Sequence, residues 1–214
     1  MSAVLPEARI SPGGRLDAFG FLDPAAWEGA TRLTPLTRAQ DGLPPEQPTV
    51  VRLQGSASGL HVRFDCADSE IRCTHVRHDA ALWEEETVEI FVAAGDVVPA
   101  RYVEIEVNPA GTLFDAIVDN PQGRRATMRV DTSWAAAGLA ARVEREAAAR
   151  WSAELCLPWR AIWGRGDPPG VLRANFFRID RPLGTEAEFS AWSPTLVEPA
   201  DFHRPERFGT IVLA

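Results

Sequence analysis

The feature that most constrains the fold of this chain is a series of short segments in which apolar and polar side chains alternate, or in which β-branched and aromatic residues dominate. Both patterns are typical of β-strands. The segments predicted to be strands are residues 49–54, 60–65, 87–92, 102–107, 112–118, 151–157, 171–180 and 209–213, with 189–192 as a further candidate. Gly- and Pro-containing turns separate them. We therefore expect an all-β fold, a two-sheet antiparallel β-sandwich of jelly-roll or immunoglobulin-like type.

Two short helices are expected beside these strands. Asp23 is a good N-cap and Pro24 is tolerated at the first helical position, so a short helix begins there and carries Trp27. Residues 158–163 predict one or two further helical turns.

The most ambiguous segment is residues 133–150, which are rich in Ala, Arg and Glu. Propensity favours a helix there, but the segment has no apolar stripe, so a strand over residues 141–146 is the alternative. We expect residues 1–16 to be an extended or frayed lead-in. Residues 17–214 then form one domain, because a β-sandwich of this length is commonly a single unit.

Composition excludes several classes of partner and compartment. The chain has 22 Lys and Arg against 30 Asp and Glu, a net charge of −8, so nucleic acid is not an expected partner. No apolar stretch is long enough to span a membrane or to form the apolar core of a signal peptide, which predicts a cytoplasmic protein. The odd number of cysteines predicts three free thiols, with Cys66 and Cys156 at least partly buried.

No standard metal or catalytic motif is present. Cys66, Cys73, His75 and His78 lie close in sequence, but their spacing matches no zinc pattern. Carboxylates suit a hard cation better, and no cofactor is expected to be essential. The residues that we expect could hold a structural calcium ion are Asp17, Asp23, Asp65 and Asp68.

Glu104 and Glu106 share one face of a predicted strand, and we expect that face to be solvated. A sugar-processing enzyme or enzyme subunit is one alternative function, in which Glu89 or Glu104 would act as acid or base. The chain contains neither a nucleophile elbow nor a zinc-protease motif nor a phosphate-binding loop.

Two tryptophans stand outside any core periodicity. Trp83 lies in an acidic segment, and Trp192 immediately precedes a predicted loop. An indole ring near a carboxylate is what sugar binding needs, because the ring packs on C–H faces and the carboxylate accepts from hydroxyls. Each tryptophan could equally plug an edge of the sandwich.

Several motifs taken together resemble the family 9 carbohydrate-binding modules. The similarity extends over residues 17–213. The matching motifs are Leu22-Asp23 with Trp27, the run from Asp79 through Leu82-Trp83 to Thr87-Val88-Glu89-Ile90-Phe91, Tyr102 to Thr112, Trp151 to Trp159, Asn175-Phe176-Phe177-Arg178, Trp192-Ser193-Pro194, and Phe202-His203 to Gly209.

This resemblance implies a β-sandwich related to the DOMON domains, with structural calcium and an extended segment at residues 133–150. It also implies a binding site for the end of a glucose- or xylose-type oligosaccharide or polysaccharide. Trp83 and Trp192 would stack on the two sides of the sugar, and Glu89 would bind its hydroxyls. Asn175 and Arg178 are the next polar candidates. An extracellular location would fit the family better than a cytoplasmic one.

The relation to DOMON domains raises a second alternative, a haem-binding electron-transfer domain. Haem needs axial His or Met ligands. Met128 is the only internal Met, and the four His residues, at 61, 75, 78 and 203, suggest no opposed pair. A non-catalytic carbohydrate-binding protein is therefore the leading hypothesis.

Overall fold

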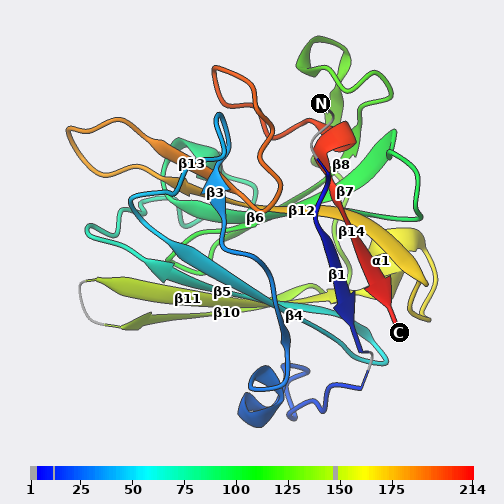
Figure 1. Ribbon diagram of the computed structural model, residues 1–214. Helices are drawn as coiled ribbons and strands as arrows, with labels where there is room; N and C mark the ends of the chain where they lie inside the picture. The colour runs from blue at the N-terminus through cyan, green and yellow to red at the C-terminus, as the bar shows by residue number, and fades with distance from the viewer. Residues whose placement is uncertain (1–3, 12, 147–148) are drawn as a thin grey trace.

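The computed structural model describes residues 4–11, 13–146 and 149–214, and these residues form two β-sheets packed face to face (Figure 1). The predicted all-β sandwich is thereby confirmed. The strands are β1 (Glu7–Ile10), β2 (Thr31–Arg32), β3 (Thr37–Arg38), β4 (Thr49–Gly55), β5 (Gly59–Ala67), β6 (Thr87–Ala94), β7 (Arg101–Val107), β8 (Leu113–Asp119), β9 (Arg129–Asp131), β10 (Ala140–Glu146), β11 (Arg150–Pro158), β12 (Val171–Asp180), β13 (Glu188–Ala191) and β14 (Gly209–Leu213).

The larger sheet has nine strands in the order β1-β14-β12-β6-β7-β8-β9, with β13 paired to β12 and β3 paired to β13. The smaller sheet has the order β10-β11-β5-β4-β2. The strand pairs are antiparallel except that β1 runs parallel to β14. Residues 7–10 of the expected lead-in therefore form an edge strand of the larger sheet, beside the C-terminal strand (Figure 1).

The main core lies between the sheets and follows from the predicted alternation. Val88, Ile90 and Val92 of β6 point into it, as do the alternating apolar residues of β7, β5 and β11. Burial of this much apolar surface is the main favourable term in folding.

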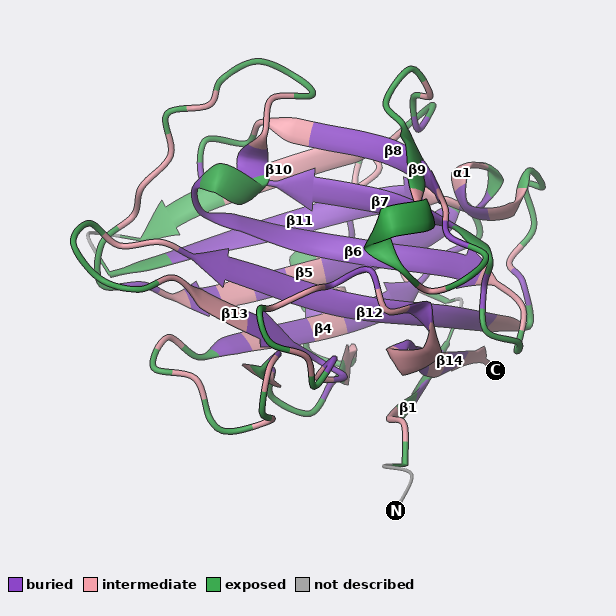
Figure 2. Cartoon of the chain, turned by 90° about the horizontal axis from the view of Figure 1, so that it is seen from above, coloured by how far each residue is buried: buried purple, intermediate pink, exposed green. Residues whose placement is uncertain are grey.

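The outer face of the larger sheet is also buried, which a half-solvated sheet would not show. Phe91, Tyr102 and Phe177 lie on this face and pack against Phe202 and Phe208 of the C-terminal segment. Figure 2 shows the central strands β6, β7 and β12 buried along most of their length. Loops over this face create the setting for a cavity.

The helical segments are short. The expected turn at Pro24 is a 3₁₀ helix, η1 (Pro24–Trp27), and three more 3₁₀ turns are η2 (Leu82–Glu84), η3 (Arg125–Thr127) and η4 (Pro205–Arg207). The α-helix is α1 (Trp159–Trp163), where the sequence predicted helical turns; it ends at Gly164, which has φ of 78°.

The helical propensity of residues 133–150 does not decide their structure. Residues 140–146 form β10, an edge strand that pairs with β11 from Ala140 to Glu146. Ala141 and Val143 pack on the core, and Arg142 forms an ion pair with Glu154 on the neighbouring strand. The strand alternative was therefore right, because strand pairing and packing outweigh a weak propensity; residues 147 and 148 lie outside the described part.

The three cysteines are free thiols, as predicted, with Cys66 and Cys156 buried. Among the described residues, no helix is long and apolar enough to cross a membrane.

Candidate functional site

A cavity of about 480 Å³ lies on the outer face of the larger sheet. Its side chains come from strands β6, β7, β8, β9, β12 and β13 and from the short turns and loops that cover the sheet. The carboxyl groups lining the cavity are those of Glu89, Glu104 and Glu106, and its aromatic rings are those of Trp83, Phe114, Phe189 and Phe202. The lining also includes two arginines, a methionine and a histidine: Arg125, Arg181, Met128 and His203.

Strand alternation brings the three glutamates together. On β6, Glu89 points away from the core because Val88 and Ile90 point into it, as the sequence predicted. Glu106 of β7 is the direct cross-strand partner of Glu89, and Glu104 lies two residues away on the same face. One carboxylate oxygen of each residue lies within 4.8 Å of the others.

The expectation that Glu104 and Glu106 are solvated was wrong. Their exposed fractions are 5% and 1%, and that of Glu89 is 2%. The reason is that loops cover this face of the sheet, so that side chains directed away from the core are buried beneath the loops. Like charges opposite each other on neighbouring strands are destabilising, so ionising these carboxyl groups together costs folding free energy.

Burial and mutual repulsion govern the protonation of these carboxyl groups. Burial raises the pKa of Glu104 to about 8. Burial, then the neighbouring glutamates, raises the pKa of both Glu89 and Glu106 well above the ordinary value. Arg125 lowers the pKa of Glu89 and Glu104 by its charge, but less than burial raises it. At neutral pH the cluster therefore retains protons and can both donate and accept hydrogen bonds.

Trp83 stands in η2 with 43% of its surface exposed. Leu82 anchors this turn in a small apolar cluster with Phe114 and Ala116 of β8. The Trp83 ring meets Phe114 edge-on, with centroids 5.4 Å apart, and the Trp83 carbonyl accepts from Arg181 Nε at 3.0 Å. The indole is thus held in place while one part of it stays accessible, as a stacking platform requires.

Trp192 does not face Trp83 across this cavity, contrary to the sequence-based expectation. It is 4% exposed, belongs to the core between the sheets and packs against Phe176, with centroids 5.8 Å apart. A Cβ at Gly209 would collide with its ring, so the backbone itself closes on the indole. Trp192 therefore plugs the sandwich, the second of the two roles considered for it.

The phase of β13 explains this outcome. Phe189 pairs with Ile179 and Ala191 pairs with Phe177, and these residues belong to the outer face. Successive residues of a strand point to opposite faces, so Trp192, directly after Ala191, points to the inner side, as Ser190 does. The aromatic residue that β13 contributes to the cavity is Phe189.

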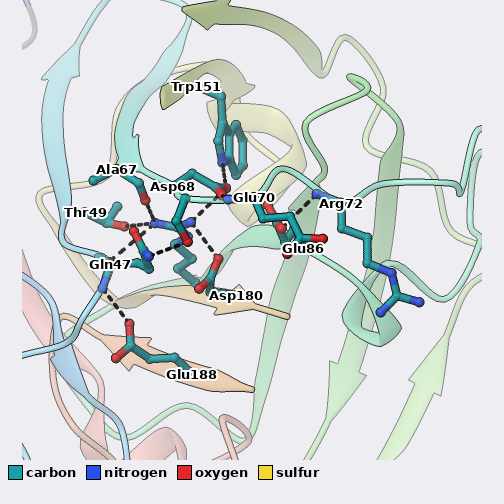
Figure 3. A network of polar contacts seen from close by, with 12 residues as sticks. Gln47, Thr49, Ala67, Asp68, Glu70, Arg72, Glu86, Trp151, Asp180 and Glu188 are labelled. Carbon is teal, nitrogen blue, oxygen red and sulfur yellow. Dashed lines mark hydrogen bonds and ion pairs between the residues drawn. The ribbon is translucent and has the colours of Figure 1, made fainter. Parts of the chain in front are cut away.

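Asn175 and Arg178 do not line the cavity either. Asn175 is fully buried, donates to the Ser193 carbonyl at 2.8 Å and accepts from the Ser193 amide at 2.9 Å, so it holds the chain after Trp192 in place. Arg178 Nη2 donates to Asp68 Oδ2 and Asp180 Oδ1, both at 3.0 Å. Figure 3 shows the network around these two aspartates, which also includes the Trp151 indole and Glu86. Asn175 and Arg178 therefore stabilise the fold and do not contact the cavity.

The four aspartates expected to hold calcium do not converge. Asp17 accepts from the backbone amides of Phe19 and Phe21, and Asp65 pairs with Arg52 and Arg63. Only Asp68 belongs to a carboxylate cluster, with Glu86 and Asp180, and there the guanidinium of Arg178 already supplies positive charge. The four aspartates therefore do not form one set of ligands, and structural calcium stays a prediction.

Met128 and His203, residue types that the haem alternative requires, both line the cavity. His203 Nδ1 lies 2.9 Å from the Tyr102 hydroxyl, and His203 Nε2 lies 4.0 Å from Glu104 Oε1. Burial lowers the pKa of His203 to about 4, so its ring is neutral at pH 7.

Sequence reasoning thus placed Trp83 and Glu89 in one cavity but missed most of the residues that share it. Glu104 and Glu106 could have been found by placing their strand beside that of Glu89 in antiparallel register. For Phe189, Phe202 and Arg125 the sequence offered no comparable signal, because they come from a strand of four residues, a loop and a short turn that tertiary packing brings to the cavity.

Comparisons with known proteins agree with this architecture. Residues 45–213 match the model of carbohydrate-binding family 9. A relative named "Extracellular protein" from the fungus Arthroderma benhamiae is 25% identical over 177 residues, 77% of this chain and 78% of that protein. This relative gives no support to the predicted cytoplasmic location.

Two solved structures share the fold. A candidate carbohydrate-binding protein from Bacteroides uniformis has a TM-score of 0.78 with 19% identity, covering 98% of both chains. A family 9 module from Caldicellulosiruptor kristjanssonii, solved with cellotriose, has a TM-score of 0.61 with 11% identity, covering 97% of this chain and 93% of that one. Since the family model matches most of the sequence, the chain belongs to carbohydrate-binding family 9.

Proposed function

We propose that the protein binds the end of a glucose- or xylose-type carbohydrate chain in the cavity on the outer face of the larger sheet. The observation that carries the proposal is the juxtaposition of an accessible indole, Trp83, with the buried glutamates 89, 104 and 106 in one cavity. A sugar ring presents an apolar C–H face and a rim of hydroxyl groups, and the cavity offers a partner for each.

In this proposal the aromatic rings stack on the sugar and the glutamates form hydrogen bonds to it. Trp83 packs on the C–H face of the ring, and Phe189 adds a second aromatic surface to the lining. The glutamates bind hydroxyls from the floor of the cavity, where a partly protonated cluster can both donate and accept hydrogen bonds. Binding sites of this size are usually concave, largely preformed and lined by apolar rings with a few polar groups.

Two relatives lend further support. The family 9 module from Caldicellulosiruptor kristjanssonii was solved with cellotriose and also with glucose, the latter at a TM-score of 0.62 and 12% identity. The fungal relative is named as extracellular, and we propose the same compartment for this chain, because polysaccharides are found there.

Calorimetric titration with cellobiose, xylobiose and glucose tests the proposal. We expect binding of at least one of them, and we expect Trp83→Ala to weaken it by about 1–3 kcal/mol, as for other aromatic anchors. Trp163→Ala is the matched control, because Trp163 is also partly exposed but lies on α1 and does not line the cavity. Equal losses in both variants, or no binding by the parent protein, would contradict the proposal.

A further inference from the structure

We propose that the sugar this cavity selects carries an amino group, so that its ammonium is held by the carboxylates of Glu89, Glu104 and Glu106. The inference rests on the proposed function and specifies the class of ligand. Its starting point is the crowding of acidic groups in the cavity floor, where three carboxyl groups are at least nine-tenths buried and lie within 4.8 Å of one another.

The cations that line the cavity do not bond to these glutamates. Arg125 Nε pairs with Asp201 at 3.3 Å, and its side chain is largely exposed. Arg181 Nε donates to the Trp83 carbonyl, and its guanidinium lies over the Phe189 ring. His203 is neutral at pH 7, because burial lowers its pKa to about 4.

One oxygen of the cluster is left without any partner. Glu106 Oε2 is buried and makes no hydrogen bond to any residue that the structure describes. A buried acceptor without a partner costs about 1–3 kcal/mol, and more when it is charged. A ligand that donates to this atom therefore removes that cost.

The spacing of the oxygens suits an ammonium group. An ammonium donates along tetrahedral directions, and with N···O distances of about 2.8 Å its three acceptors lie about 4.6 Å apart. One oxygen of each of the three glutamates lies within 4.8 Å of the others, so a single donor atom can reach all three. A neutral hydroxyl in the same place would donate only one hydrogen bond.

The rest of the lining favours an ammonium over a metal ion. Calcium takes 6–8 oxygen ligands, whereas beyond the three carboxylates the lining consists mainly of aromatic and aliphatic side chains and two guanidinium groups. The lining thus offers few oxygen ligands for a calcium ion, while its aromatic rings can pack on the C–H face of a sugar that brings the ammonium with it.

Calorimetry with three monosaccharides tests the inference. Glucosamine, glucose and N-acetylglucosamine are titrated in EDTA at about pH 7, below the pKa of roughly 8 of an amine such as the α-amino group. We expect glucosamine to bind about tenfold tighter than the other two, a difference of about 1.4 kcal/mol. N-acetylglucosamine is the matched neutral ligand, since it has a substituent on the same carbon without the charge.

Two variants locate the preference in the cluster. Glu106→Gln should abolish the advantage of glucosamine over glucose, and Glu144→Gln should preserve it, because Glu144 is an exposed carboxylate on the other sheet. Titrations in two buffers of different ionisation enthalpy should show proton release with glucosamine and less with glucose, since the ammonium displaces protons from the glutamates.

The outcomes separate this inference from the proposed function. Equal affinity for glucose and glucosamine overturns the amino-sugar inference and leaves carbohydrate binding intact. Glucose binding that appears only when Ca²⁺ replaces EDTA also overturns it and assigns the cluster to a metal. If none of these sugars, nor cellobiose or xylobiose, binds, both proposals fail.

Discussion

At the residue scale, two tryptophans of similar sequence context have opposite roles, and stability measurements should separate them. Trp192 is enclosed between the sheets, so Trp192→Ala should lower the free energy of unfolding by about 3–5 kcal/mol. Trp83→Ala removes a ring that is 43% exposed and should cost about 1 kcal/mol or less. Urea denaturation of the two variants measures both values, and equal losses would show that the Trp83 ring is also structural.

The buried glutamates make stability depend on pH in a predictable direction. The folded state holds protons more tightly than the unfolded state, because the pKa of Glu104 rises from 4.5 to about 8. Stability contributed by the protonated form is therefore lost as pH rises through that folded-state pKa. Asp180 and Glu86, with pKa values raised to about 6 and about 9, act in the same direction.

We expect the free energy of unfolding to fall as pH rises from 6.5 to 9. The lowered pKa of His203 makes stability rise with pH instead, but only up to the ordinary pKa of His, 6.5, where this window begins. Glu104→Gln should reduce this fall by on the order of 2 kcal/mol, whereas Glu144→Gln should leave it unchanged. Denaturant unfolding at a series of pH values provides the comparison. An identical pH profile in Glu104→Gln would mean that this carboxyl group titrates normally.

At the scale of elements, the phase of one short strand decides which aromatic ring serves the site. Because Phe189 and Ala191 of β13 face outward, Phe189→Ala should weaken carbohydrate binding by about 1–3 kcal/mol with little effect on the fold. Leu183→Ala, in the exposed loop between β12 and β13, is the control. Titration of both variants with the sugar that the parent binds best tests this, and unchanged affinity in Phe189→Ala would exclude its ring from the site.

The same elements show how far sequence reasoning reaches. The strands with clear alternation, such as β5 and β7, and the hairpin at Asn108–Gly111 could be predicted because their pattern reflects a buried face. The segment around β10 could not be settled, because its pairing with β11 is a tertiary interaction that local propensity does not contain.

The site was predicted only in part, for a related reason. Glu89 could be directed away from the core by the parity of β6, and Trp83 stood out by its polar context. Trp192 was assigned to the wrong face because a strand of four residues carries too little pattern to fix its phase. The burial of Glu104 could not be foreseen, since it depends on loops distant in sequence that cover the sheet.

At the scale of the whole molecule, both faces of the larger sheet are buried, one by the smaller sheet and one by loops. The inner side holds the hydrophobic core, and at one end of it Arg178 joins the two sheets. From β12 its guanidinium donates to the Ala67 carbonyl and to Thr49 Oγ1 at 3.3 Å, in addition to Asp68 and Asp180. The outer side holds the cavity, so the binding surface lies on a sheet that the core makes rigid.

Arg178 therefore occupies the position that a cation would take among buried carboxylates. Asp68, Glu86 and Asp180 have oxygens within 4.8 Å of one another, and the guanidinium is 1% exposed. Arg178→Ala should lower the free energy of unfolding by about 3–5 kcal/mol, because removing one partner of a buried ion pair leaves its partners uncompensated. Arg165→Ala, which removes an exposed partner of Asp167, should cost about 0–1 kcal/mol.

Thermal melts with Ca²⁺ and with EDTA complete this test. The melting temperature of the parent protein should not change with chelator, because its carboxylates already have a cation. In Arg178→Ala the three carboxylates become available to a metal, so Ca²⁺ should raise the melting temperature of this variant by mass action. A parent protein that loses stability in EDTA would show that a metal ion contributes to the fold. An Arg178→Ala variant as stable as Arg165→Ala would show that the guanidinium does not join the sheets.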